Sequence, residues 1–190
     1  MHFNPVVSFV DARFGGIRHR GAFAYLPVQI IGCVLGAIAA NGMFAKPLVS
    51  ISAHHRASPA HVFAEMIATL GLLLLIFALA RTHRSASAPA AVGAYIGAAY
   101  FFTSSTSFAN PAISVGRIFS DTFAGIAPAS VPGFVVAQTL GGAAAVLAIR
   151  ALYPAVTAAE AATVVVAHKR DRPAETDPTN AAAQPRRDRR

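Results

Sequence analysis

Two Asn-Pro pairs, Asn4-Pro5 and Asn110-Pro111, carry the side chains in this sequence with the most specific chemistry. Asn favours the position that caps the first turn of a helix, and Pro favours the first helical position. Each pair therefore predicts the start of a helix. Because the N-terminal end of a helix carries a partial positive charge, the chemistry that these pairs predict is electrostatic and needs no bond breaking.

The helices that follow the two pairs are expected to be short. The first can run from 4 to 13 and the second from 110 to 119, so each is about 15 Å long. This length is about half of the hydrocarbon thickness of a membrane. A half-helix is tolerated at membrane depth only where its ends face protein or a water-filled cavity.

A longer apolar segment follows each half-helix, with a Gln and a Gly in matching places. The first segment has Gln29 and Gly32, and the second has Gln138 and Gly141. An internal repeat in an apolar chain is typical of transporters and channels built from two related halves. The pattern Gly32-x-x-x-Gly36, together with Gly141 in the matching place of the second segment, also predicts close helix packing, through which the two repeats approach each other.

The composition predicts an all-α membrane protein. Hydrophobic residues make up 55% of the chain and charged residues only 13%. Crossing a bilayer takes about 20 apolar residues, and four stretches reach that length. These predicted spans are 22–44, 60–80, 88–108 and 131–152. Together with the half-helices they form one transmembrane domain over 1–154, and four spans exclude a soluble enzyme.

The net charge is +8, and seven of the 16 Lys and Arg residues are concentrated in 169–190 at the end of the chain. With its acids and prolines, 155–190 is expected to be a tail that is disordered from about 168. Segment 155–167 can extend the last helix or lie at the membrane interface. Clustered cations mark the cytoplasmic side of a membrane, so 13–20, 81–87 and the C-terminus are predicted to be cytoplasmic. The charge pattern does not indicate nucleic-acid binding.

These motifs together resemble the major intrinsic protein family, the aquaporins and aquaglyceroporins, over about residues 2–150. The second half carries Asn110-Pro111-Ala112 and then Gly116-Arg117-Ile118-Phe119-Ser120-Asp121-Thr122-Phe123-Ala124-Gly125-Ile126. The first half carries His2-Phe3-Asn4-Pro5-Val6, similar to the family's His-x-Asn-Pro-Ala. Glu65 with Thr69 resembles the intramembrane Glu-x-x-x-Thr of the family.

The resemblance implies an inverted repeat whose two half-helices meet at the middle of the membrane, with Asn against Asn. Both side chains would offer amide donors to a passing oxygen atom, and the helix dipoles would oppose protons and cations. The expected pore residues are Asn4, Asn110, Pro5, Pro111, Val6 and Ala112.

The function that the resemblance implies is a passive channel in the cell's inner (plasma) membrane. Its expected solutes are water and small uncharged molecules, namely polyols or metalloid hydroxides such as arsenite. Its expected partners are the lipid bilayer and further copies of the chain, as a homotetramer. No cofactor and no enzyme activity are expected.

Three polar residues inside apolar segments are predicted to be structural: Glu65, Gln29 and Gln138. An intramembrane carboxylate has a structural or functional role, and in the family this Glu accepts hydrogen bonds from the loop before a half-helix. A proton relay is the alternative for Glu65. His54, His55 and His61 could bind a metal ion, but solvated loop histidines are the favoured interpretation, so no metal site is predicted.

The predicted selectivity filter departs from the family's pattern. Water-selective members have Arg directly after the second Asn-Pro-Ala, whereas this chain has Ile113. The other filter positions fall at Ser107 and at Ala98, or at Gly97 if the register is shifted by one. The filter is therefore expected to be wider and less polar than that of a strict water channel. Arg117 could substitute for the absent cation, but a structural arginine at the helix end is the favoured interpretation.

The family has six spans, and this chain shows four, so the first two transmembrane helices are expected to be missing. Those spans would carry the counterpart of Glu65 in the first repeat. An incomplete pore wall would leave polar backbone groups facing lipid, at several kcal/mol each. The alternative function is therefore a truncated, non-conducting membrane fragment of such a channel.

Overall fold

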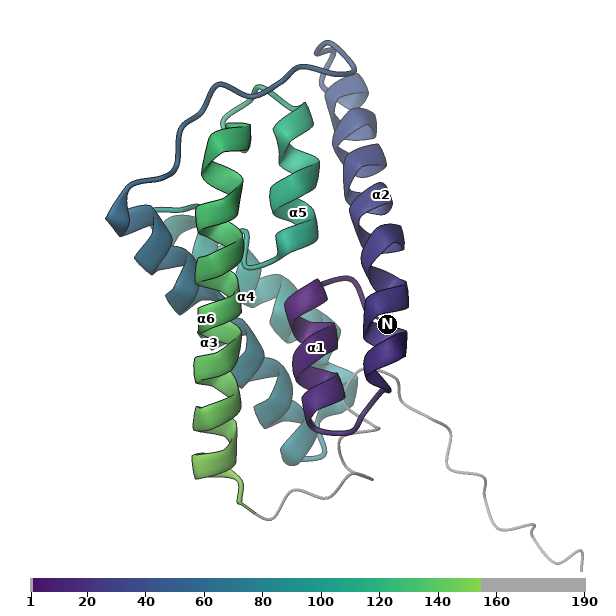
Figure 1. Ribbon diagram of the computed structural model, residues 1–190, viewed down its shortest axis with the longest axis vertical. Coiled ribbons are helices and arrows are strands. Elements are labelled where there is room, and N and C mark those ends of the chain that lie inside the picture. Colours follow the sequence, from purple (N-terminus) through teal and green to yellow (C-terminus); the bar gives the residue numbers. More distant parts are fainter. Residues whose placement is uncertain (1, 155–190) are drawn as a thin grey trace, which may run out of the picture.

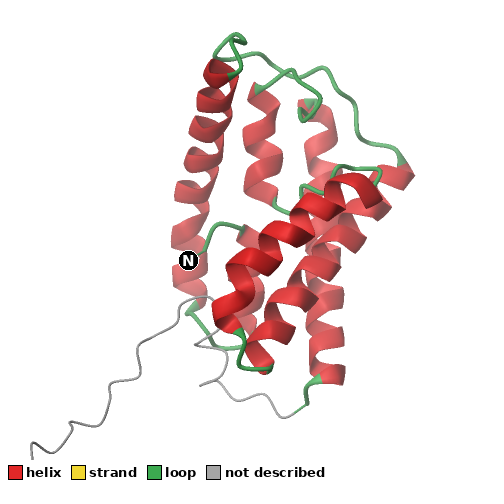
Figure 2. Ribbon diagram, turned by 180° about the vertical axis from the view of Figure 1, so that it is seen from behind, coloured by secondary structure: helices red, strands yellow, loops and turns green. Residues whose placement is uncertain are grey.

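The computed structural model describes residues 2–154, and these residues form helices and loops without a strand (Figure 2). The predicted tail, 155–190, lies outside the described residues. In chain order the α-helices are α1 (Pro5–Arg13), α2 (His19–Met43), α3 (Pro59–Arg81), α4 (Ala88–Phe102), α5 (Pro111–Gly116) and α6 (Val131–Leu152). Short 3-10 turns lie at η1 (Ser85–Ser87), η2 (Arg117–Phe119) and η3 (Pro128–Ser130). The fold of the described residues is all-α, as the sequence predicts.

Three of the described helices are long and apolar enough to cross a membrane: His19–Met43, Pro59–Arg81 and Pro128–Leu152. The remaining predicted span, 88–108, is too long, because α4 ends at Phe102 after 15 residues. Beyond Phe102 the chain becomes extended at Thr103 and then has a positive φ at three residues. These residues are Thr106, Ser107 and Ala109. No helix continues through left-handed backbone, so α4 must stop before this loop.

Two half-helices, α1 and α5, lie between the longer helices, and their N-terminal ends point toward each other (Figure 1). Each packs against both α2 and α6. The loop 44–58 and the segment 117–130 lie at the upper end of the bundle in Figure 1. The connections 14–18 and 82–87 lie at the lower end. The longer helices therefore alternate in direction, while α1 and α5 each extend over about half of the bundle.

Both half-helices begin with the cap that the Asn-Pro pairs predict. The Asn4 side chain accepts a hydrogen bond from the Val6 backbone N–H at 3.0 Å. The Asn110 side chain accepts from the N–H groups of Ala112 at 2.9 Å and Ile113 at 3.3 Å. In both, Pro follows as the first helical residue, because its absent N–H needs no partner there. The second half-helix is α5 with the turn η2 after it, so its last part is 3-10 rather than α-helical.

Of the glycines predicted to allow close helix packing, Gly141 lies at a close contact, whereas Gly32 and Gly36 do not. A Cβ on Gly141 would overlap the backbone oxygen of Met66, where α6 crosses α3. A Cβ on Gly116 would lie 2.7 Å from the backbone carbonyl of Cys33, where α5 crosses α2. In contrast, no described atom lies within 4 Å of the place that a Cβ would take on Gly32 or Gly36. Within the described residues, the prediction that this pair brings the repeats together is wrong.

We expect Gly141→Ala to lower the free energy of unfolding by about 2 kcal/mol, because the added methyl must displace backbone of α3. The matched control is Gly32→Ala, which adds the same methyl at the corresponding place of the other repeat and should change stability by no more than about 0.5 kcal/mol. Denaturant titration of both variants in detergent micelles gives the comparison. Equal losses of stability would mean that α3 and α6 do not approach as closely as described.

Candidate functional site

The N-terminal ends of the two half-helices are joined by a reciprocal pair of hydrogen bonds. The Asn4 amide Nδ2 donates to the backbone oxygen of Ala109 at 2.7 Å. The Asn110 amide Nδ2 donates to the backbone oxygen of Phe3 at 3.1 Å. Each Asn thus binds the residue directly before the other Asn, and each uses its side-chain oxygen to cap its own helix. The two Asn-Pro pairs therefore meet at one place in the middle of the bundle.

Each of these amides has hydrogen-bonding capacity to spare. An Asn side chain carries two N–H donors, and within the described residues each Nδ2 makes one hydrogen bond. Asn4 is 8% exposed and Asn110 is 6% exposed, so both amides sit at the edge of the packed interior. The positive ends of two helix dipoles converge at the same place. Together these groups can bind the oxygen atom of a neutral molecule and disfavour a cation.

The residues after each Pro lie in the packed interior. Val6 belongs to a buried apolar cluster with Phe77, and Ala112 has no exposed surface. Their backbone N–H groups are bound by the capping Asn side chains. Val6 and Ala112 are thus buried next to the two Asn side chains, and their role in the pore stays a prediction.

The repeat also places one serine and one glutamine behind each Asn. Ser8 Oγ donates to the Asn4 backbone oxygen at 3.0 Å, and Gln29 Nε2 donates to Ser8 Oγ at 3.1 Å. The same two hydrogen bonds recur in the second half.

Ser114 Oγ donates to the Asn110 oxygen at 3.1 Å, and Gln138 Nε2 donates to Ser114 Oγ at 3.0 Å. Each glutamine thus donates a hydrogen bond to a serine of a half-helix, and the structural role of both glutamines stays a prediction. The sequence analysis missed the two serines, although each lies four residues after its Asn and so has a visible signal in the repeat.

Glu65 of α3 is the acceptor that organises the loop before the second half-helix. Its carboxylate has no exposed surface. It accepts hydrogen bonds from Ser105 Oγ at 2.8 Å, from Phe108 N at 2.7 Å, from Ala109 N at 2.8 Å and from Gln138 Nε2 at 2.7 Å. Four donors balance the cost of burying one negative charge. Glu65 thus joins α3 and α6 to the loop before α5, and its scaffold role stays a prediction.

These hydrogen bonds stabilise a backbone that is otherwise unfavourable. Thr106, Ser107 and Ala109 have φ angles of 63°, 46° and 47°. Residues with a Cβ adopt this region at a cost of about 1–3 kcal/mol each, so the surrounding contacts must impose it. Because Ala109 both donates to Glu65 and accepts from Asn4, its conformation links the buried carboxylate to the Asn pair.

The three predicted filter residues come from three segments at the upper half of the bundle. Ala98 is exposed on α4, and Ile113 is half-buried on α5. Ser107 is 2% exposed, and its hydroxyl has no hydrogen-bond partner among the described atoms. A buried hydroxyl without a partner is rare unless water or a ligand completes its hydrogen bonds. Of the three, Ser107 therefore shows the clearest capacity to bind a polar molecule.

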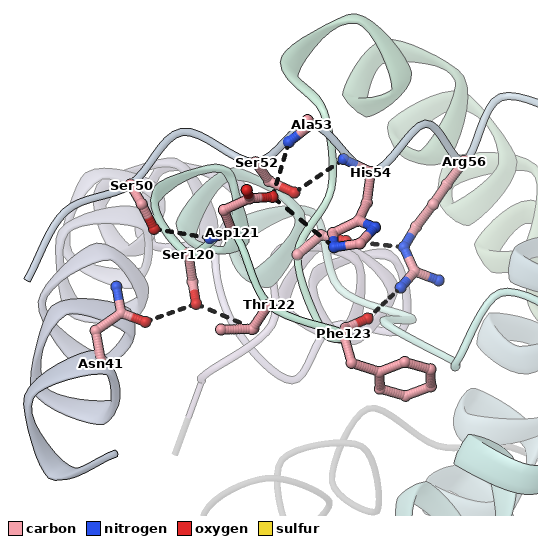
Figure 3. A network of polar contacts seen from close by, with 11 residues as sticks. Asn41, Ser50, Ser52, Ala53, His54, Arg56, Ser120, Asp121, Thr122 and Phe123 are labelled. Atoms are coloured by element: carbon pink, nitrogen blue, oxygen red, sulfur yellow. Dashed lines mark hydrogen bonds and ion pairs between the residues drawn. The ribbon is translucent and has the colours of Figure 1, made fainter. Parts of the chain in front are cut away.

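A polar network closes the upper end of the bundle by joining the loop 44–58 to the segment after α5 (Figure 3). The Ala53 N–H donates to Asp121 Oδ1 at 3.0 Å, and the Asp121 N–H donates to Ser50 Oγ at 2.9 Å. His54 Nε2 lies 3.8 Å from Asp121 Oδ1. Arg56 donates to the backbone oxygens of three residues in two loops, which are Ser105, Phe123 and Gly125. The network holds the loop over the end of the half-helix.

The described residues contain no group of three or more His, Cys, Asp or Glu side chains that could hold a metal ion. Ser58 caps α3 by accepting a hydrogen bond from the His61 backbone N–H at 3.3 Å, and the ring nitrogen Nδ1 of His61 lies 2.9 Å from the same Ser58 Oγ.

The comparisons with known proteins agree with this geometry. The model of the major intrinsic protein family matches residues 1–119 of this chain. The aquaglyceroporin AqpS of Rhizobium meliloti (strain 1021) is 45% identical over 149 residues, which are 78% of this chain and 64% of that protein. The chain thus spans less than two thirds of this relative's length. No solved structure gives a significant match. With its matching family model, its paired Asn-Pro half-helices and its apolar helices, the chain belongs to the major intrinsic protein family and is a multi-pass membrane protein.

Proposed function

We propose that this protein is a passive transmembrane channel for water and small uncharged solutes. The observation that carries the proposal is the reciprocal hydrogen bonding of Asn4 and Asn110 at the meeting point of two helix N-termini. An oxygen atom of a passing solute accepts the spare amide N–H donors, and the helix dipoles repel cations. Solutes move down their gradients and no bond is broken, so the protein does not act as an enzyme.

The proposed solutes are polyols and metalloid hydroxides such as arsenite, in addition to water. The support is the chemistry of the filter residues, because Ala98 and Ser107 are small and Ile113 has no hydrogen-bonding group. A wide filter admits molecules larger than water, and the unpartnered Ser107 hydroxyl can bind their hydroxyl groups. The similarity to an aquaglyceroporin supports the same class of solute.

We place the channel in the plasma membrane, with the lower end of Figure 1 and the C-terminus in the cytoplasm. The support is the charge pattern, since Arg13, Arg18, Arg20, Arg81 and Arg84 all lie at or near the lower connections. We further propose that the protein assembles as a homotetramer, by analogy with its family.

The direct test is a stopped-flow assay with liposomes that contain the full chain. Liposomes are mixed with hyperosmotic glycerol, arsenite or an impermeant sugar, and light scattering follows their volume. We expect rapid shrinkage in every case and faster reswelling than in empty liposomes with glycerol and arsenite. Rates equal to those of empty liposomes for all three solutes would contradict the proposal.

Ile113→Arg is expected to reduce glycerol and arsenite flux about tenfold and water flux much less. An arginine adds a bulky cation with fixed donors next to the half-helix start, and it removes the space that larger solutes need. The matched control is Ile113→Met, which has a long but uncharged side chain. Equal reductions for all solutes would mean that Ile113 is not part of the filter.

A further inference from the structure

We propose that Arg117 supplies the cation of the selectivity filter from a position one helical turn beyond Ile113, where it excludes cations without narrowing the passage. Arg117 follows Ile113 by four residues, and the half-helix continues from α5 into η2 without a break. Residues four apart lie on the same face of a helix, so Arg117 lies above Ile113 toward the upper end. The inference deepens the proposed channel function and rests on it for its effect on transport.

The contacts of Arg117 place its guanidinium beside the other filter segments. Its Nη2 donates to the Tyr100 hydroxyl, and its Nη1 donates to the Ala124 oxygen at 3.1 Å. Its Cζ lies 4.6 Å from the centre of the Phe108 ring. Tyr100 lies two residues beyond Ala98 on α4, and Phe108 directly follows Ser107. The guanidinium therefore contacts the helix that carries Ala98 and the loop that carries Ser107.

A purely structural arginine at a helix end would need only the contact with Ala124, which closes the turn after η2. The contacts with Tyr100 and Phe108 do something different, because they bind the half-helix to α4 and to the loop before α5. A guanidinium held by a hydroxyl, a carbonyl and a ring has one orientation, which is what selection by fixed donors requires.

The charge of Arg117 has no compensating carboxylate. The described residues contain two ion pairs, His2 with Asp11 and His54 with Asp121, and neither involves Arg117. A second cation, Arg56, lies 5.5 Å from the centre of the same Phe108 ring. Burial and the nearby Arg117 charge lower the pKa of Arg56, while Tyr100 and the buried Glu65 carboxylate act in the opposite direction, so the two guanidinium groups and Glu65 all interact. The two cations around Phe108 outnumber this one carboxylate and produce a positive potential at the upper end of the passage.

In this arrangement different residues set the width of the constriction and its charge, whereas one arginine directly after Asn-Pro-Ala would set both. Ile113 leaves space at the constriction, whereas Arg117 supplies the charge one turn further out. A neutral polyol or metalloid hydroxide can therefore pass, and a cation of the same size is repelled. The expected selectivity is for hydroxylated neutral molecules over ammonium-type cations.

Charge-selective thiol labelling tests the position of this cation. In a Cys33→Ala background, Ala98→Cys provides one thiol on the exposed filter position of α4. We compare its reaction rates with an anionic and a cationic methanethiosulfonate reagent, each normalised to a small free thiol. The anionic reagent should react faster by about tenfold at low ionic strength, and added salt should reduce this ratio.

Three further variants distinguish the effect of Arg117. Arg117→Ala should reduce the rate ratio by about threefold or more, and Arg117→Lys should retain most of it because the charge remains. The control Arg150→Ala removes an exposed arginine in the last turn of α6, at the other end of the bundle from Arg117, and should leave the ratio unchanged. An Arg117→Ala ratio equal to that of Arg150→Ala, in protein that elutes normally from size-exclusion chromatography, would overturn the proposal.

Solute flux measured on the same preparations separates this inference from the proposed function. If the wild-type protein transports glycerol, Arg117→Ala should raise methylammonium flux relative to glycerol flux, and an unchanged ratio counts against the inference. If no neutral solute is transported, the channel proposal fails, whereas the labelling ratio still shows whether Arg117 carries the charge at Ala98.

Discussion

Replacing Glu65 with Ala is expected to lower the free energy of unfolding by about 3–5 kcal/mol and to abolish solute flux. Ser105, Phe108, Ala109 and Gln138 all donate to this carboxylate, and the site is closed to water. An unpartnered buried donor costs about 1–3 kcal/mol, and removing the buried charge offsets part of the sum.

The loss of flux has its own physical reason. Without the carboxylate the Ala109 N–H loses its acceptor, so the Asn4 amide alone must hold the unfavourable positive φ of Ala109, and we expect the Ala109 oxygen to turn away from Asn4. Denaturant titration in detergent measures the stability, and liposome reswelling measures the flux. Glu65→Gln keeps one acceptor oxygen and should lose about half as much stability. A Glu65→Ala protein within about 1 kcal/mol of wild type would show that the loop does not depend on Glu65.

The features that could be predicted from the sequence are those that depend on neighbouring residues. Asn4 and Asn110 cap their helices with N–H groups two or three residues away, so the pattern alone locates both helix starts. Glu65 could be recognised because a carboxylate within a long apolar stretch needs several donors, wherever they come from. Three of the donors lie 40 to 44 residues further along the chain and the fourth, Gln138, lies 73 residues further, so they could not be predicted individually.

The features that could not be predicted depend on distant contacts. The end of α4 is an exception, because 103–107 reads Thr-Ser-Ser-Thr-Ser and these residues favour loops over helix interiors, a local signal that the predicted span 88–108 overlooked. The tertiary hydrogen bonds of Glu65 stabilise the loop that follows. The glycine pattern at Gly32 was misleading, because small residues permit close packing without showing which partner is present. The contact between Arg117 and Tyr100 could not be predicted either, since Tyr100 lies on another helix.

Asn110→Asp is expected to reduce glycerol flux at least about tenfold and to raise potassium permeability, while α5 stays folded. Asp keeps the oxygen that caps Ala112 and Ile113, so the helix start is preserved. It loses the N–H groups that bind the Phe3 oxygen and a passing solute. Its negative charge also opposes the positive ends of the two helix dipoles, which lowers the barrier to cations.

Asn4→Asp should have the same effects to within about twofold, because Asn4 makes the equivalent bond to Ala109 in the other half. A matched control is Asn41→Asp, since the Asn41 amide also donates to backbone oxygens, those of Leu48 and Phe119, but at the upper end. This control should disturb the loop 44–58 and leave the potassium barrier at the bundle centre intact.

Glycerol reswelling and potassium flux under an imposed membrane potential, measured on all three Asp variants, decide the matter. The arrangement of the two halves requires Asn4→Asp and Asn110→Asp to behave alike and unlike Asn41→Asp. If only one of the central variants admits potassium, the two half-helices do not share one barrier. If neither admits more potassium than Asn41→Asp, the cation barrier lies elsewhere, and the charge at Arg117 becomes the principal source of cation exclusion.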